Sequence, residues 1–154
     1  MAIPELIPIW RDPETRTGTI GRYEGGQFIG CITGAFPPGY TPGPDWHLHK
    51  RWYAVLHRFD HDGHHVGSDF WCPGPGYQGD QQEERLTQWL DALPGREYCD
   101  IAIRLFEVTH EGVLFGLVAE RHNEYAEGEE EDDWAELYPD GLGFTAPWDG
   151  GYDT

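Results

Sequence analysis

The stretch Arg51–Phe59, RWYAVLHRF, predicts a central β-strand and decides how the rest of the chain is interpreted. Side chains alternate between the two faces of a strand. One face would carry Trp52, Ala54 and Leu56, and the other Tyr53, Val55, His57 and Phe59. These residues are mostly aromatic, β-branched or otherwise apolar, which is typical of a strand inside a sheet.

The residues that follow predict a hairpin. Asp60–Gly63, Asp-His-Asp-Gly, is typical of a turn, and His64–Trp71 would return as the second strand. If Phe59 pairs with His64, Trp52 lies opposite Trp71 and Tyr53 opposite Phe70. Aromatic pairs across strands contribute roughly 0.2–1 kcal/mol each, so we expect this register.

The turn resembles the opening of a calcium loop, but its spacing excludes that interpretation. In a calcium loop the glycine follows the first aspartate by five residues, and the twelfth position is glutamate. Here Gly63 follows Asp60 by three residues, and the twelfth position is Trp71. The sequence therefore predicts a plain turn.

Two further hairpins are expected on either side of a helix. Residues 19–23 and 27–33 flank a turn at Glu24-Gly25-Gly26, where glycine permits positive φ. Asp80 is a suitable N-cap for the helix, which carries one apolar stripe and ends at Pro94-Gly95. The stripe consists of Leu86, Trp89, Leu90 and Leu93. Residues 100–107 and 113–121 would form the last hairpin, covered by that helix.

The predicted fold is therefore α+β, an antiparallel sheet of about six strands in the order ββββ-α-ββ with one main helix packed on it. A length of 154 residues suits a single domain, with residues 1–123 as its core and 124–154 as an acidic, aromatic C-terminal arm. No apolar run approaches the roughly 20 residues that span a bilayer, and we expect no signal peptide. Three widely spaced cysteines favour a reducing, cytoplasmic location.

Charge is concentrated at the C-terminal end. The net charge is −18, and residues 124–154 hold eleven of the 28 acidic residues and none of the ten basic ones. Such a surface repels phosphate backbones and attracts basic proteins. We therefore expect no nucleic-acid partner and predict a protein partner.

The arm has two interpretations. Asp132 or Asp133 could cap a short helical turn that carries Trp134, Leu137 and Tyr138, and the aromatic side chains would then dock on the protein's own sheet. Alternatively they are anchors for a partner that the acidic run attracts. The candidate partner-binding residues are Glu129, Glu130, Asp132, Asp133, Trp134 and Tyr138.

Scarcity of reactive residues excludes several chemistries. The chain has one lysine, Lys50, and one serine, Ser68, so a phosphate-binding Walker loop cannot be built. Ser68 lies in a predicted strand without the sharp turn of a nucleophile elbow. No dinucleotide-binding glycine pattern follows a strand, and no catalytic residue or cofactor is predicted.

The histidines leave one chemical possibility open. His47 and His49 would face the same way if their segment were extended, and could then bind one metal ion. The long loop 35–50 and the loop 73–79 should meet at one end of the central hairpin. That end would gather Tyr40, His47, His49, Asp69, Cys72 and Tyr77. Loop histidines that merely stack on aromatic rings are the alternative.

Several strings of the sequence resemble a family of small actinobacterial proteins labelled formate hydrogenlyase regulatory protein. They are KRWYAVLHRFD, GSDFW, LPGREYCDIAI and DDWAELYPDGLGF–PWDGGYDT, and together they extend over nearly the whole chain. The closing string is the most specific. The resemblance implies no catalytic residues.

Three functions follow as hypotheses. The first is a non-enzymatic cytosolic regulator or immunity-type inhibitor that binds a basic protein. The second is a small metal-dependent enzyme or metal-binding protein that uses His47 and His49. The third is a small-molecule binding module with an aromatic-lined cleft beneath the proline-rich loops.

Overall fold

The structure is a computed structural model that describes residues 3–76, 79–120 and 133–153. Within these ranges it contains two helices and eleven strands. The helices are α1 (Trp46–His49) and α2 (Gly79–Asp91). The strands are β1 (Ile7–Ile9), β2 (Ile20–Tyr23), β3 (Gly26–Ala35), β4 (Arg51–Phe59), β5 (His65–Trp71), β6 (Glu97–Tyr98), β7 (Ile101–Ile103), β8 (Phe106–His110), β9 (Val113–Glu120), β10 (Trp134–Tyr138) and β11 (Leu142–Phe144).

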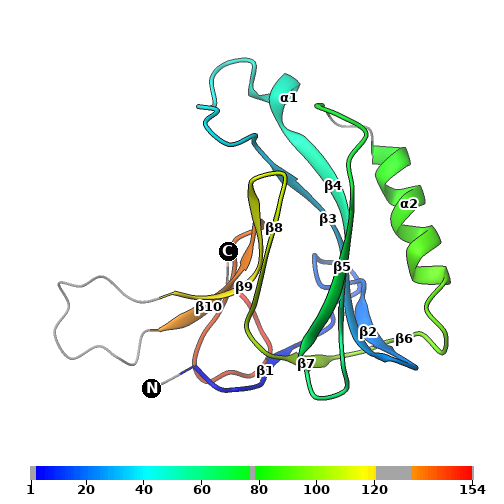
Figure 1. The fold of residues 1–154 in the computed structure, drawn as a ribbon. Helices are drawn as coiled ribbons and strands as arrows, with labels where there is room; N and C mark the ends of the chain where they lie inside the picture. The colour runs from blue at the N-terminus through cyan, green and yellow to red at the C-terminus, as the bar shows by residue number, and fades with distance from the viewer. Residues whose placement is uncertain (1–2, 77–78, 121–132, 154) are drawn as a thin grey trace, which may run out of the picture.

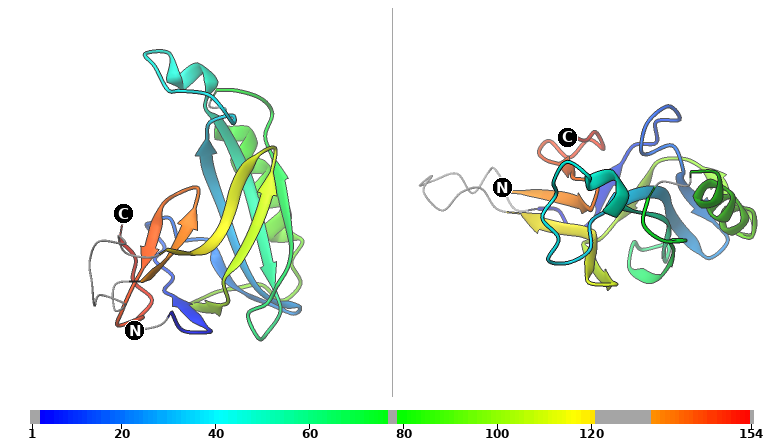
Figure 2. Two further views of the ribbon diagram at one scale, coloured as in Figure 1. Left: turned by 60° about the vertical axis from the view of Figure 1, so that its left-hand side comes forward. Right: turned by 90° about the horizontal axis from the view of Figure 1, so that it is seen from above.

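The strands form three antiparallel sheets. A five-stranded sheet has the order β5-β4-β3-β2-β6, a four-stranded sheet has the order β11-β10-β9-β8, and β1 pairs with β7. The helix α2 lies along one face of the five-stranded sheet, and the four-stranded sheet lies toward the other face (Figures 1 and 2). The α+β class, the antiparallel sheet and the packed helix are therefore confirmed.

The central strand β4 has the two faces that its alternation predicts. Ala54 and Leu56 pack with Phe28 of β3 under α2. Tyr53 and Val55 point the other way and pack against Val113 and Phe115 of β9. Full burial of such side chains stabilises the fold by roughly 1.5–3 kcal/mol each, so β4 contributes to the core on both faces.

The predicted register of the central hairpin is wrong by two residues. Trp71 lies opposite Ala54, not Trp52, and Phe70 lies opposite Val55, not Tyr53. The turn is longer than expected because the backbone N–H of Asp60 bonds to the carbonyl of His64. An irregularity next to Arg58 and Phe59 then adds Val66 to the returning strand as a β-bulge.

The main helix is where the sequence predicts it. Leu86, Leu90 and Leu93 are buried against β3 and β4, and Trp89 is partly buried beside them. Gln82, which is fully buried, donates from its side-chain amide to the carbonyl of Trp52 and ties α2 to β4. Neither helix in the described ranges is long and apolar enough to cross a membrane.

The strand count differs from the expected six because short segments pair separately. Residues 101–103 do not belong to the last hairpin but pair with β1, for which no strand was predicted. The hairpin of β8 and β9 turns at Glu111 and Gly112 as expected, but it belongs to the four-stranded sheet. Its predicted cover by α2 is therefore wrong, since α2 packs on β3 and β4.

The described part of the C-terminal arm is built into the fold. Residues 134–138, expected as a helical turn, form β10 and pair with β9, so that expectation is wrong. Ala135 and Leu137 of β10 and Phe144 of β11 are buried in the largest core cluster. Three of the candidate partner-binding residues, Glu129, Glu130 and Asp132, lie outside the described residues.

Candidate functional site

A cleft of about 590 Å³ lies between α2 and β3, and it is the feature best suited to hold a ligand. Leu86 and Leu90 form its wall on the α2 side, and Pro139 and Asp140 lie on another side. Its lining mixes apolar side chains with polar and charged ones in similar proportion, so a ligand would meet both kinds of surface. The lining residues are Thr15, Arg16, Thr19, Cys31, Ile32, Gly34, Lys50, Trp52, Glu83, Leu86, Thr87, Leu90, Tyr98, Pro139 and Asp140.

Two cations line this cleft. The Lys50 ammonium lies 4.5 Å from the centre of the Trp52 ring, a distance at which a cation is attracted to an aromatic face. Arg16 donates a hydrogen bond to the backbone carbonyl of Asp140. Within the described residues neither cation forms an ion pair with a carboxylate. Both remain able to bind a negatively charged group.

The acidic groups of the cleft are differently engaged. The Asp140 carboxylate accepts a hydrogen bond from the hydroxyl of Thr33, while Glu83 is exposed on α2.

The cleft is also lined by the thiol of Cys31. Desolvation, with a smaller contribution from Asp140, raises the pKa of this thiol well above its usual range. A protonated thiol is a poor nucleophile, so Cys31 is suited to lining the cleft and not to covalent catalysis.

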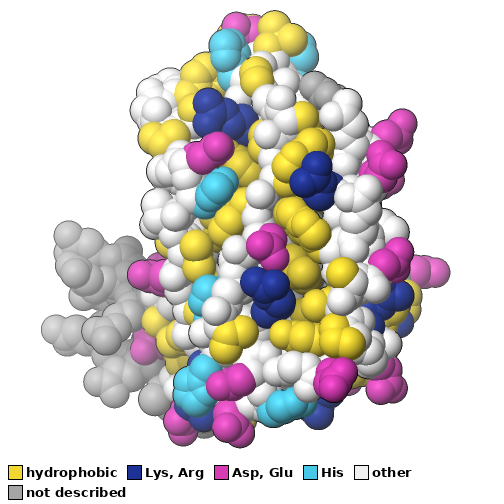
Figure 3. Space-filling view, turned by 45° about the vertical axis from the view of Figure 1, so that its right-hand side comes forward, with side chains coloured by type: hydrophobic (Ala, Val, Ile, Leu, Met, Phe, Trp, Pro, Cys, Tyr) yellow, Lys and Arg dark blue, Asp and Glu magenta, His cyan; other side chains and the backbone are white. Residues whose placement is uncertain are grey.

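The two candidate metal ligands lie at the tip of the molecule on α1. Their segment is helical, so the premise of an extended segment is wrong, and residues two apart on a helix do not face each other. The Nε2 of His49 lies 3.2 Å from the Asp45 carboxylate, and its ring lies 4.7 Å from that of Tyr40. Hydrophobic, acidic and histidine side chains gather at this tip (Figure 3). Trp46 and Leu48 there are 46% and 60% exposed.

The expected neighbourhood around these histidines forms only in part. Asp69 makes an ion pair with Arg58 instead, and the Cys72 thiol donates to the carbonyl of Gly74. Tyr77 lies outside the described residues. No group of three potential metal-ligating side chains occurs in the part of the chain that the structure describes. Metal binding by His47 and His49 stays a prediction, with no third ligand to support it there.

The chain's only serine lies between two histidines, an arrangement that sequence reasoning missed. The hydroxyl of Ser68 is 2.6 Å from Nδ1 of His57 and 2.7 Å from Nε2 of His65. His57 stands opposite Ser68 in the β4–β5 ladder. The bulge at Val66 places His65 on the same face, because an extra residue reverses the alternation of the strand.

This trio resembles a serine–histidine pair but lacks the properties of a nucleophilic one. Burial lowers the pKa of His57 to about 3, so its imidazole is a weak acceptor for the serine proton near neutral pH. Burial also lowers the pKa of His65. Both rings pack against Phe106 of β8, at centroid distances of 4.9 and 4.8 Å. We interpret the trio as a polar connection between β4 and β5, with two rings that pack on the four-stranded sheet.

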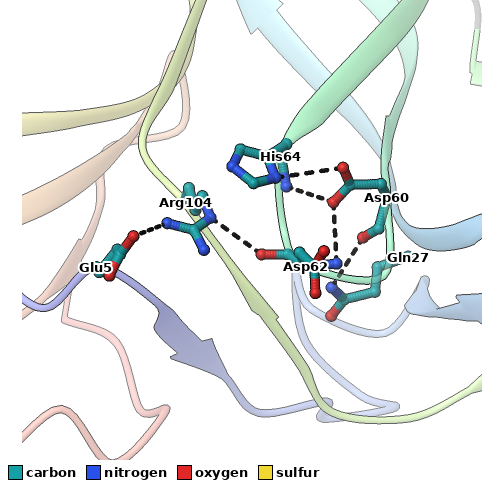
Figure 4. Close-up of polar contacts among 6 residues, drawn as sticks. All are labelled: Glu5, Gln27, Asp60, Asp62, His64 and Arg104. Carbon is teal, nitrogen blue, oxygen red and sulfur yellow. Dashed lines mark hydrogen bonds and ion pairs between the residues drawn. The ribbon is translucent and has the colours of Figure 1, made fainter.

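The Asp60 turn is a structural turn, as its spacing predicts. The Asp60 carboxylate accepts hydrogen bonds from the backbone N–H groups of Asp62 and His64, and these lower its pKa (Figure 4). The side chain of Gln27 donates to the Asp60 carbonyl, and Arg104 donates to the carbonyl of Asp62. The carboxylate is thus occupied by the chain's own backbone.

Of the six candidate partner-binding residues, the three that the structure describes are only partly exposed. Trp134 and Tyr138 lie on β10, and the Tyr138 hydroxyl donates to the carboxylate of Glu120 on β9, which raises the pKa of Tyr138. Asp133 directly precedes the strand and is partly buried. Trp134 and Tyr138 are therefore parts of the sheet, and partner binding by the six candidate residues stays a prediction.

Comparison of the chain with protein-family models, with curated proteins and with solved structures found no match. The resemblance to proteins labelled formate hydrogenlyase regulatory protein stays a prediction.

The cleft itself was not predicted from the sequence, since it is assembled from segments far apart in the chain. One signal did point toward it: Lys50 is the only lysine in a chain of net charge −18, and it lines the cleft.

Proposed function

We propose that this protein is a binding module whose ligand lies in the cleft between α2 and β3. The observation that carries this proposal is the volume of about 590 Å³ together with its lining. Ligand pockets usually measure roughly 300–1,000 Å³ and combine apolar walls with a few placed polar groups. The proposal relocates the small-molecule hypothesis from the proline-rich loops to the helix side of the five-stranded sheet.

The lining supports binding better than catalysis. Leu86, Leu90 and Tyr98 supply apolar contact area, and Lys50 and Arg16 supply two cations. The thiol of Cys31 is held protonated, and the Ser68 trio is not among the residues that line the cleft. The function supported here is therefore recognition, in agreement with the hypothesis of a regulatory, non-enzymatic protein.

A neutral fluorescent probe, N-phenyl-1-naphthylamine, tests the cleft directly. A side chain added at Gly34 would enter it, since a Cβ there would meet Cε of Lys50 and would lie 3.0 Å from the Trp52 ring. Gly43 provides the matched control, because a Cβ there meets only Asp45 at 3.8 Å. We expect Gly34→Leu to weaken probe binding about tenfold, and Gly43→Leu to leave it unchanged.

Thermal unfolding against a panel of metabolites extends the test to natural ligands. A ligand at about 100 times its dissociation constant adds roughly 2.7 kcal/mol to the free energy of unfolding. A stabilising compound should lose its effect in Gly34→Leu and keep it in Gly43→Leu. Equal binding of the probe by both variants, or none by the natural chain, would remove the cleft as the functional site.

A further inference from the structure

The cleft contains a sheet edge that no strand covers within the described residues. The strand β3 pairs with β4 as far as Ala35, but it pairs with β2 only as far as Ile29. Thr19, just before β2, makes the last contact: its carbonyl accepts from the backbone N–H of Gly30 at 2.8 Å. Beyond Gly30 the edge of β3 faces the cleft.

The backbone groups that face the cleft can be assigned from this last contact. Gly30 directs both its N–H and its C=O toward Thr19, whose hydroxyl donates to the Gly30 carbonyl. In an antiparallel ladder, alternate residues direct their backbone groups to the same side. Ile32 and Gly34, which line the cleft, therefore present their N–H and C=O groups to it. Cys31 and Thr33 direct theirs toward β4.

The walls of the cleft suit an added strand. The side chains of Leu86 and Leu90 are in reach of the β3 edge, since a Cβ added at Gly30 would lie 3.2 Å from each. Side chains on that face of an added strand would meet this apolar wall, and alternate ones would face Asp140. The cations Arg16 and Lys50 line the same space without a carboxylate partner in the described chain.

We propose that the ligand of this cleft is an extended peptide segment of a partner protein, which adds as a strand to β3 at Ile32 and Gly34. The segment carries a carboxylate that binds Lys50 or Arg16. In this mode main-chain hydrogen bonds give affinity, and pockets for alternate side chains give specificity. The inference rests on the proposed function of the cleft.

Selection of a displayed random heptapeptide library on the full chain supplies the probe. Enriched peptides are then synthesised and their affinities measured for two variants at one position. Gly34→Pro removes the N–H that faces the cleft and leaves the β3–β4 ladder intact, whereas Gly34→Ala adds a Cβ and keeps the N–H. Loss of one main-chain hydrogen bond should make the proline variant bind about three- to tenfold more weakly than the alanine variant.

A second measurement leaves the protein unchanged and so does not depend on how the variants fold. Methylation of the peptide's amide nitrogens one at a time should weaken binding at alternate positions only, because a strand directs alternate N–H groups to its neighbour.

The variants Lys50→Met and Arg16→Met test the role of the peptide's carboxylate. We expect one of them to weaken peptide binding several-fold and to reduce the dependence of that binding on salt.

Each outcome has a distinct meaning. Equal affinity of Gly34→Pro and Gly34→Ala, or a methylation profile without alternation, overturns the strand inference. Failure to enrich any peptide, while the naphthylamine probe still binds the natural chain and not Gly34→Leu, also overturns it and leaves the cleft as a ligand site. If the naphthylamine probe does not bind the natural chain either, or binds Gly34→Leu equally well, the proposed function itself is wrong.

Discussion

At the scale of single residues, His57 is the side chain whose environment has the clearest measurable consequence. It is 2% exposed, its Nδ1 lies 2.6 Å from the Ser68 hydroxyl, and aromatic rings, including that of His65, surround it. Arg58 and Asp69, the sequence neighbours of His57 and Ser68, form an ion pair with each other at 3.3 Å. Burial lowers the pKa of His57 to about 3, so the imidazole is neutral in the folded protein.

This shift predicts a loss of stability in mild acid. Between about pH 6.5 and 3 the unfolded chain binds a proton at His57 that the folded chain does not, so stability falls as the pH falls. The contribution of His57 to the free energy of unfolding changes by at most about 1.4 kcal/mol per pH unit. In urea unfolding from pH 7 to pH 4, we expect the natural chain to lose stability relative to His57→Asn.

The variant Ser68→Ala separates burial from hydrogen bonding as the cause. It should destabilise the fold at neutral pH by about 1–3 kcal/mol, because it leaves the buried Nδ1 of His57 without its partner. It should keep the acid dependence, since burial is the main cause of the low pKa of His57. A loss of that dependence in Ser68→Ala would show that the hydroxyl, not burial, keeps His57 neutral.

At the scale of elements, the strand β10 decides how the acidic arm can be studied. Leu137 is 8% exposed in the largest core cluster, so Leu137→Ala should cost about 2–5 kcal/mol in the free energy of unfolding. The neighbouring Glu136 is only partly buried, and Glu136→Ala should cost less than about 1 kcal/mol. Chemical denaturation of both variants measures the difference, and equal effects would contradict the packing of β10.

The same strand limits truncation experiments. Removal of residues 133–154 would delete Ala135, Leu137, Leu142 and Phe144 from the core, so a shortened chain would lose binding merely because it unfolds. The contribution of the arm to partner binding is therefore better tested by charge substitution than by deletion. Suitable positions are Glu129, Glu130, Asp132 and Asp133.

Elements with a local signal were predictable from the sequence, and elements defined by distant partners were not. The two faces of β4 and the apolar stripe of α2 follow from periodicity, which each segment carries within itself. For β10 the local pattern predicts a helical turn instead, because Trp134, Leu137 and Tyr138 also fit helical spacing. Pairing with β9, more than a dozen residues earlier, overrides that local preference.

The site was less predictable than the fold for the same reason. The cleft brings together the turn before β2, the open edge of β3, the helix α2 and the Pro139–Asp140 turn. No short motif spans these segments. The Ser68 trio likewise depends on a bulge at Val66, and one extra residue in a strand has no distinct sequence signal.

At the scale of the whole molecule, the net charge of −18 has a consequence for stability. The chain has 28 acidic and ten basic residues, so repulsion between the excess negative charges opposes the compact state. Salt screens this repulsion, with a Debye length of about 10 Å at 0.1 M. Salt also weakens attractive pairs such as Arg58–Asp69, but exposed pairs of this kind contribute only about 0–1 kcal/mol. Because repulsive pairs outnumber attractive ones, screening should stabilise the fold.

We therefore expect the midpoint of thermal unfolding to rise by about 2–4 °C between about 10 mM and 300 mM sodium chloride, which corresponds to about 1 kcal/mol for a chain of this size. A variant with Glu129→Gln, Glu130→Gln, Asp132→Asn and Asp133→Asn changes the net charge from −18 to −14, and its unfolding midpoint should rise less. An equal rise in both chains would place the repulsion outside this segment. A fall in the natural chain would mean that attractive pairs outweigh repulsion, which contradicts the prediction.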